Sequence, residues 1–186
     1  MSSMWEMPVS LEVGGTGYSI RTDYRAILDI LSYFNDPDYE DDEKILICLD
    51  ILYEDFDSIP PELWGEAYEK AKSFIDMGME ADKGKPTLMD WEQDAQIIIP
   101  AINHVIGREV RAESYMHWWT FLSAYMEIGE SLFSNVLNIR QKRARGKKLE
   151  KYEQEFYKEN RSLINLKKKE TEEDRKNKEA LKELFR

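Results

Sequence analysis

The spacing of apolar residues predicts a β-hairpin near the start of the chain. Val9, Leu11 and Val13 alternate with polar residues, and residues 18–20 return after a glycine pair at positions 14–15. Glycine readily adopts the positive φ of a tight turn, and a period of two is typical of a strand. Because two strands alone are not stable in water, we expect the hairpin to lie on the helices that follow.

After the hairpin, apolar residues recur at positions i, i+3, i+4 and i+7, which is the spacing of one helix face. Thr22 or Asp23 can cap the first helix, and Pro100 should kink or split the fourth. The expected fold is mainly α, a helical bundle with an N-terminal β-hairpin. The predicted helices cover residues 24–34, 41–53, 61–75, from 87 or 90 to 105, 115–126, and from 132 into Arg140.

The end of the chain has a different pattern. A near-heptad run of apolar residues begins at Leu149 and ends at Leu166, whereas residues 167–179 contain no apolar side chain. The first pattern favours a helix, and the second cannot bury a face. We therefore expect an extended basic C-terminal helix that is partly disordered. The apolar pairs at 180–181 and 184–185 are candidates for docking on a partner or another subunit.

The distribution of charge separates the same two parts. Of the 186 residues, 26 are Lys or Arg and 37 are Asp or Glu, so the formal net charge is −11. Residues 1–139 hold 9 basic and 27 acidic side chains, whereas residues 140–186 hold 17 basic and 10 acidic ones. This predicts an acidic helical body over 1–139 and a basic helical tail over 140–186. The acidic body disfavours a generic nucleic-acid-binding protein.

Composition limits the class of protein further. Hydrophobic residues make up 42% of the chain, which is enough to fill a core. The single cysteine, Cys48, excludes an internal disulfide framework and fits a reducing cytosol. No segment near the start joins positive charge to an apolar run, so a signal peptide is not expected. The densest apolar run, residues 97–102, is far shorter than the roughly 20 residues of a membrane helix. We expect a soluble protein that does not bind a membrane.

The residues that could carry chemistry do not form a known motif. Residues 36–40 resemble the start of a calcium loop, but Asp41 stands where that loop needs glycine and Ile47 where it needs an acid. His104 and His117 are not in a zinc-binding spacing. We therefore expect no catalytic residue, no cofactor and no metal ion.

Two features are candidates for binding a partner. The adjacent residues Trp118 and Trp119 point about 100° apart on a helix, so one can pack in the core while the other contributes to a protein interface. The basic segment 140–148 can contact phosphates, an acidic protein surface, the acidic body of a second copy, or solvent. The candidate partner-binding residues are Trp118, Trp119, Arg140, Lys142, Arg143, Arg145, Lys147 and Lys148.

Four sequence blocks occur in the order found in one protein family. The blocks are residues 22–25 (Thr-Asp-Tyr-Arg), residues 90–95 (Asp-Trp-Glu-Gln-Asp-Ala) with Ile98, residues 117–121 (His-Trp-Trp-Thr-Phe) and residues 138–140 (Asn-Ile-Arg). With the hairpin, these blocks resemble the bacteriophage gene-product-fifteen family, small proteins of tailed phages and prophages in Gram-positive bacteria. The resemblance spans residues 8–145 and departs at residues 103–107, where the family is more aromatic.

The resemblance implies a role in phage tail assembly. Such proteins are encoded beside the major tail protein and ahead of the tape-measure protein, the position usual for tail assembly chaperones. It therefore implies a non-enzymatic chaperone that binds the tape-measure or other tail proteins in the cytoplasm of the bacterial host, and self-association is also compatible. Two other hypotheses stay open: a nucleic-acid-binding adaptor that uses the basic C-terminal helix, and a small enzyme that uses Asp90, Asp94 or His117.

Overall fold

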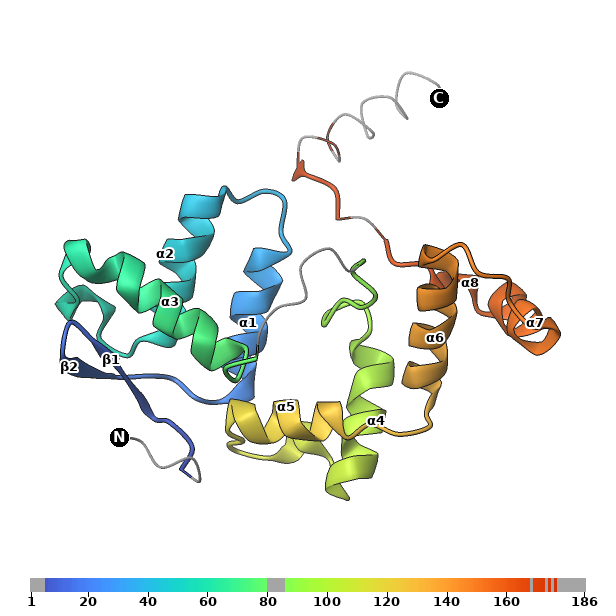
Figure 1. Cartoon of the computed structure of the whole chain (residues 1–186), viewed down its shortest axis with the longest axis horizontal. Helices are drawn as coiled ribbons and strands as arrows, with labels where there is room; N and C mark the ends of the chain where they lie inside the picture. Colours follow the sequence, from blue (N-terminus) through green and yellow to red (C-terminus); the bar gives the residue numbers. More distant parts are fainter. Residues whose placement is uncertain (1–5, 80–85, 168, 173, 175, 177–186) are drawn as a thin grey trace.

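The computed structural model describes residues 6–79, 86–167, 169–172, 174 and 176. Within these residues it contains a two-stranded antiparallel sheet and eight α-helices, so the predicted mainly α fold with an N-terminal hairpin is confirmed (Figure 1). The strands are β1 (Ser10–Val13) and β2 (Thr16–Ser19), and three short 3-10 helices are η1 (Phe56–Ser58), η2 (Pro61–Leu63) and η3 (Val110–Ala112). The α-helices are α1 (Tyr24–Phe34), α2 (Asp41–Leu52), α3 (Trp64–Ile75), α4 (Ala95–Ile106), α5 (Trp118–Met126), α6 (Leu132–Ala144), α7 (Lys151–Glu159) and α8 (Arg161–Ile164).

The hairpin forms where the alternation predicts it and rests against α3. Leu11 pairs with Tyr18 across the two strands, and the turn begins at Gly14, whose φ is +57°. A Cβ atom at Gly14 would lie only 2.6 Å from Leu63 Cδ1. The Gly14 N–H also donates to Glu66 Oε1 at 3.2 Å. Glycine at this position therefore permits both the turn and its close approach to the start of α3.

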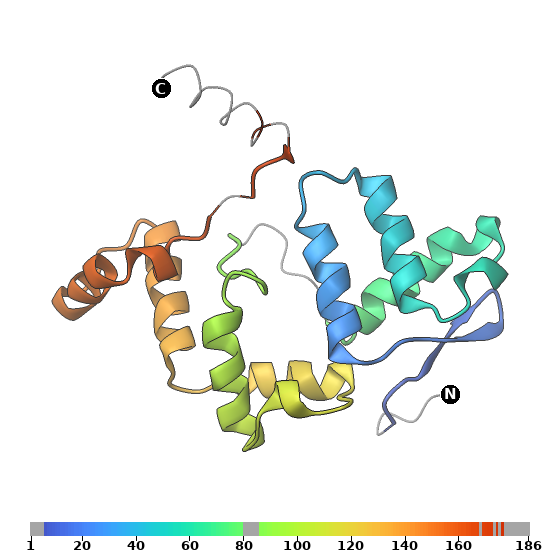
Figure 2. The ribbon, with the colours of Figure 1, turned by 180° about the vertical axis from the view of Figure 1, so that it is seen from behind.

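The first three helices form the N-terminal part of the core. Helix α1 packs on α2, and α2 packs on α3 (Figures 1 and 2). The buried Tyr53 hydroxyl, just after α2, donates to Ala67 O of α3 at 2.9 Å. Asp23 caps α1, since its carboxylate accepts the Arg25 N–H at 3.0 Å, and it also accepts the Met116 N–H at 3.0 Å. One carboxylate thus starts α1 and holds the segment that precedes α5.

Helix α5 joins these helices to the C-terminal half of the chain. Phe121 stacks on Tyr24 of α1 with ring centroids 4.4 Å apart. Trp118 is buried, and its Nε1 donates to Ile75 O at the end of α3 at 2.8 Å. Helix α5 also contacts α4, and α4 in turn contacts α6. The core is therefore continuous from the hairpin to α6.

The fourth helix begins later than the apolar pattern predicts. Helix α4 starts at Ala95, because the Asp90 carboxylate accepts the N–H groups of Glu92 and Gln93 at 3.0 and 2.8 Å and closes a turn there. The predicted start at residue 87 or 90 is therefore wrong. Helix α4 continues through Pro100 as one helix, so it is not split there.

The C-terminal tail is not one extended helix. Helix α6 ends at Ala144, Gly146 adopts a φ of +64°, and the chain then forms the two shorter helices α7 and α8. A positive φ is incompatible with continuing a right-handed helix, which explains the break. Ile164 of α8 is buried, so this part of the tail packs on the body. Residues 177–186, with both apolar pairs, lie outside the described residues.

We expect Trp118→Ala to lower the free energy of unfolding by about 3–5 kcal/mol, because it empties a fully buried site. Chemical denaturation followed by far-ultraviolet circular dichroism measures the loss. Tyr152→Ala is the control, because Tyr152 is 68% exposed, and it should cost less than about 0.5 kcal/mol. Equal stability of the two variants would contradict the packing of α5.

Candidate functional site

The two candidate tryptophans both fasten α5 to α3. Trp118 lies in the core, whereas Trp119 is half-buried and its Nε1 donates to Phe74 O at 2.9 Å. His117 is buried, and its Nδ1 accepts the Trp119 N–H at 3.0 Å, which caps α5. His117 Nε2 lies 3.0 Å from Pro8 O, so the same ring holds the segment before the hairpin. Of the two tryptophans, only Trp119 has solvent-exposed surface that a partner could contact.

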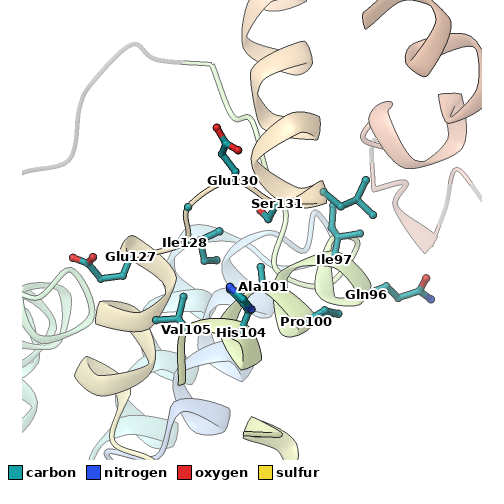
Figure 3. Close-up of a pocket in the computed structure, with 12 residues that line it drawn as sticks. Gln96, Ile97, Pro100, Ala101, His104, Val105, Glu127, Ile128, Glu130 and Ser131 are labelled. Carbon is teal, nitrogen blue, oxygen red and sulfur yellow. The ribbon is translucent and has the colours of Figure 1, made fainter. Parts of the chain in front are cut away.

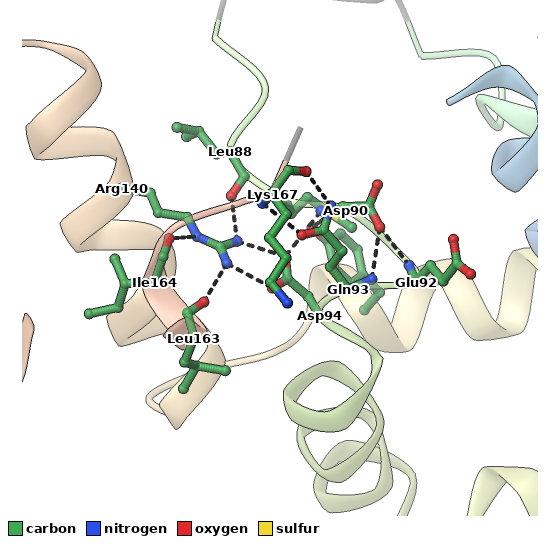
Figure 4. A network of polar contacts seen from close by, with 11 residues as sticks. Leu88, Asp90, Glu92, Gln93, Asp94, Arg140, Leu163, Ile164 and Lys167 are labelled. Atoms are coloured by element: carbon green, nitrogen blue, oxygen red, sulfur yellow. Dashed lines mark hydrogen bonds and ion pairs between the residues drawn. The ribbon is translucent and has the colours of Figure 1, made fainter. Parts of the chain in front are cut away.

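Arg140 is an internal residue of α6, with 7% of its surface exposed. Its Nη1 and Nη2 atoms pair with Asp94 Oδ2 and Oδ1 at 2.6 and 2.8 Å (Figure 4). Nη1 also donates to Leu88 O, Nη2 to Leu163 O and Nε to Ile164 O, at 2.7–2.9 Å. All five N–H groups of the guanidinium are therefore used. This candidate cation is not available at the surface, and α6 continues across the expected boundary between residues 139 and 140.

The tail continues from this network across the body. The Gln93 side chain pairs with the backbone of Lys167 through two hydrogen bonds of 2.8 Å, one donated by Nε2 and one accepted by Oε1. Farther along, the Glu172 N–H donates to Asp38 Oδ1 at 2.7 Å. The described tail thus runs from α8 over the start of α4 to the loop between α1 and α2.

A second buried acid holds α7 against α6. Glu153 is 2% exposed, and its Oε1 accepts Lys142 Nζ at 2.6 Å and Asn138 Nδ2 at 2.9 Å. Its Oε2 accepts the Glu150 N–H at 2.8 Å, which closes the cap of α7. The hydrogen bond from Lys142 holds the pKa of Glu153 below its ordinary value and raises the pKa of Lys142. Lys142 is therefore also engaged within the chain.

Arg143 contacts the tail as well. Its guanidinium carbon lies 4.3 Å from the centre of the Tyr157 ring, and its Nη1 donates to Asn165 Oδ1. A cation over an aromatic ring contributes about 0.5–1 kcal/mol at an exposed site. Three of the six candidate cations, Arg140, Lys142 and Arg143, thus hold the tail in place.

The other three candidate cations remain exposed. Arg145, Lys147 and Lys148 lie between α6 and α7, and the side chain of none of them forms a hydrogen bond or ion pair with another residue of the described ranges. We call these three residues the basic corner. Tyr152 follows them on α7 and is exposed. The basic corner is therefore the part of the predicted partner-binding segment that the fold leaves free.

A groove of about 500 Å³ lies between α4 and the loop that joins α5 to α6, and we call it the α4 groove (Figure 3). Glu127, Glu130 and His104 are exposed around it. The apolar pattern did not reveal this groove, because it assigned Val105 and Leu132 to inward helix faces, whereas both are exposed there. Its apolar lining includes Ile97, Pro100, Ala101, Val105, Ile128 and Leu132.

Reactive side chains are few in the described part of the chain. No three or more His, Cys, Asp or Glu side chains of those residues are placed to hold a metal ion. Cys48 is buried, and burial raises its pKa to about 12, which disfavours the nucleophilic thiolate. No helix in the described ranges has the length and apolar character that crossing a membrane requires.

Comparison with known proteins places the chain in a protein family. A sequence model of the family described as Bacteriophage Gp15 protein matches residues 4–166. That range includes the hairpin, the eight described helices and every residue that accepts a hydrogen bond from Arg140 in the described part of the chain. The resemblance to the gene-product-fifteen family is thereby confirmed. No curated protein and no solved structure matches the chain.

We expect Arg140→Met to destabilise the protein by about 3–5 kcal/mol, because it leaves the buried Asp94 carboxylate unpaired. The double variant Arg140→Met/Asp94→Leu should cost less than the sum of the single changes, since neither charge is then orphaned. Urea denaturation of the natural protein, the two single variants Arg140→Met and Asp94→Leu, and the double variant measures the interaction free energy between the two side chains. Arg145→Met at the exposed basic corner is the control. If the double variant loses as much stability as the two single variants together, the result would contradict an interaction between Arg140 and Asp94.

Acid should weaken the contact of α7 with α6. The folded-state pKa of Glu153 lies below its ordinary value of 4.5, so its stabilising contribution is complete above that value. The contribution is lost as the pH falls through the folded pKa. The stability difference between the natural protein and Glu153→Gln should therefore be largest near neutral pH and shrink on acidification. Denaturation at a series of pH values measures it, and exposed Glu155→Gln is the control. A difference that does not depend on pH would contradict the pairing.

Proposed function

The chain belongs to the bacteriophage Gp15 protein family, and we propose that it is a non-enzymatic tail assembly chaperone. In this role it binds the tape-measure protein in the cytoplasm of the bacterial host and keeps it soluble until the tail tube forms around it. The family match over residues 4–166 carries the proposal. The family resemblance further implies a gene beside that of the major tail protein and ahead of that of the tape-measure protein, the position usual for tail assembly chaperones.

The roles of the reactive residues support a binding function. His117 and Asp94, which an enzyme could have used, are buried and engaged in a helix cap and an ion pair. Asp90 closes the turn before α4. Coating a long chain needs several weak contacts that act together, and it needs no reacting group.

The basic corner is the surface we assign to the tape-measure protein. Its three cations lie within four residues of one loop and project from a folded part of the chain. A cluster of exposed cations steers an acidic or mixed-charge partner toward contact, and such contacts are weak and reversible in salt. Reversibility suits a chaperone that must release its client when tail-tube subunits assemble.

Co-expression tests this assignment. We expect the full-length chain to raise the amount of soluble tape-measure protein of the same phage several-fold and to co-purify with it. The variant Arg145→Glu/Lys147→Glu/Lys148→Glu should lose the complex, because the corner then repels acidic segments of its partner. The control carries the same change in net charge at Lys44, Lys70 and Lys158 and should keep the complex. No rise in soluble tape measure and no complex with the natural protein would overturn the proposal.

A nucleic-acid-binding adaptor is the second candidate, because the exposed Tyr152 follows the basic corner. An aromatic ring can stack on a base while nearby cations neutralise phosphates. Fluorescence anisotropy with a single-stranded oligonucleotide separates the two functions. Tight binding that falls steeply with salt and disappears in the triple variant, without a tape-measure complex, would favour the adaptor.

A further inference from the structure

The α4 groove presents apolar side chains that the described chain does not cover. Val105 and Leu132 line it and are 39% and 46% exposed. Removing apolar surface from water is favourable, so the groove favours an apolar occupant. Glu127 and Glu130 on its loop side pair with no cation of the described residues, so a basic occupant gains two partners.

The last nine residues of the chain, 178–186, have the properties of such an occupant. Their sequence is Lys-Glu-Ala-Leu-Lys-Glu-Leu-Phe-Arg. Three large apolar residues stand at i, i+3 and i+4, which is one face of a helix, and three cations recur at intervals of four. The apolar residues are Leu181, Leu184 and Phe185, and the cations are Lys178, Lys182 and Arg186.

We propose that segment 178–186 of one copy docks in the α4 groove of a second copy. The segment lays its apolar face over Val105 and Leu132, which is the way amphipathic helices are recognised by apolar grooves. Its cations approach the carboxylates of Glu127 and Glu130. The segment also holds Glu179 and Glu183, so its three cations leave a side-chain net charge of +1, opposite in sign to the two carboxylates of the groove. The acidic body and the basic tail have opposite net charges as well. This contact leaves the basic corner free and does not depend on the tape-measure protein.

The course of the described tail favours a second copy over the same copy. Glu172 is bonded to Asp38 in the loop between α1 and α2. In both views this loop lies in the upper part of the picture, whereas the loop between α5 and α6 lies in the lower part (Figures 1 and 2). The described tail therefore passes the start of α4, near the Gln96 end of the groove, and continues to the loop between α1 and α2, away from Val105 and Leu132. To cover Val105 and Leu132 of its own groove, the segment would have to turn back along the length of α4.

Such docking joins two different surfaces, so it is heterologous and continues from copy to copy. Contacts of this kind close into rings or extend as open assemblies. Each copy offers one segment and one groove, and blocking either surface stops growth at that copy. This property allows the two halves of the contact to be tested separately.

Sedimentation of the purified full chain tests the contact. The natural protein should show a mass above the 22.0 kDa of one chain, rising with concentration. Leu132→Asp blocks the groove but keeps the fold, because a carboxylate is favourable in the first turn of α6. It should stay at 22.0 kDa, and so should Phe185→Asp, which blocks the segment. The control Leu46→Asp changes an exposed leucine of α2 and should associate like the natural protein.

Mixing the two blocked variants distinguishes docking between copies from docking within one. The Leu132→Asp protein keeps an intact segment and the Phe185→Asp protein keeps an intact groove. An equal mixture should form dimers of twice 22.0 kDa and nothing larger. A mixture that stays monomeric would overturn the proposal. A natural protein that is monomeric at every concentration would also overturn the proposal, whether its segment fills its own groove or binds another partner. A Leu132→Asp protein that associates like the natural protein would overturn it as well.

Discussion

The buried pair of Arg140 and Asp94 is the interaction on which the C-terminal half of the fold depends. Removing both charges from water costs several kcal/mol for each ion, and this cost is offset only when every donor finds an acceptor. The acceptors come from separate segments: Leu88 and Asp94 precede α4, whereas Leu163 and Ile164 lie at the end of the tail helices. Arg140 is therefore satisfied only when the tail returns to α4. One side chain makes the tail a part of the folded body.

This constraint divides the basic residues near the end of α6 into two groups. Arg140, Lys142 and Arg143 hold the tail through a carboxylate, a second carboxylate and an aromatic ring. The three residues of the basic corner lie beyond them and stay exposed. The proposed chaperone thus presents its cations from a folded corner, and a preorganised surface loses less conformational entropy on binding than a disordered one. The same fold also exposes the α4 groove.

The parts of the fold that could be predicted are those whose sequence pattern lies within a short stretch of the chain. The alternation of the hairpin and the cap of α1 at Asp23 each lie within a few neighbouring residues. The start of α4 could not be predicted, because Asp90 suits a helix cap and a turn equally well. The role of Arg140 could not be predicted either, since its acid partner is 46 residues away and arginine is usually a surface residue. The α4 groove joins a helix to a later loop, so no single sequence window contains it.

Hydrogen exchange at the backbone of residues 160–167 tests most directly whether Arg140 fastens the tail. The N–H groups of Ile164 and Asn165 donate within α8, and that of Lys167 donates to Gln93. If the Arg140 pair holds the tail on the body, these N–H groups should exchange as slowly as those of α6, because releasing them breaks the buried pair. Exchange at the rate of an unstructured peptide, while α6 stays protected, would show that the tail is detached and would contradict this role of Arg140.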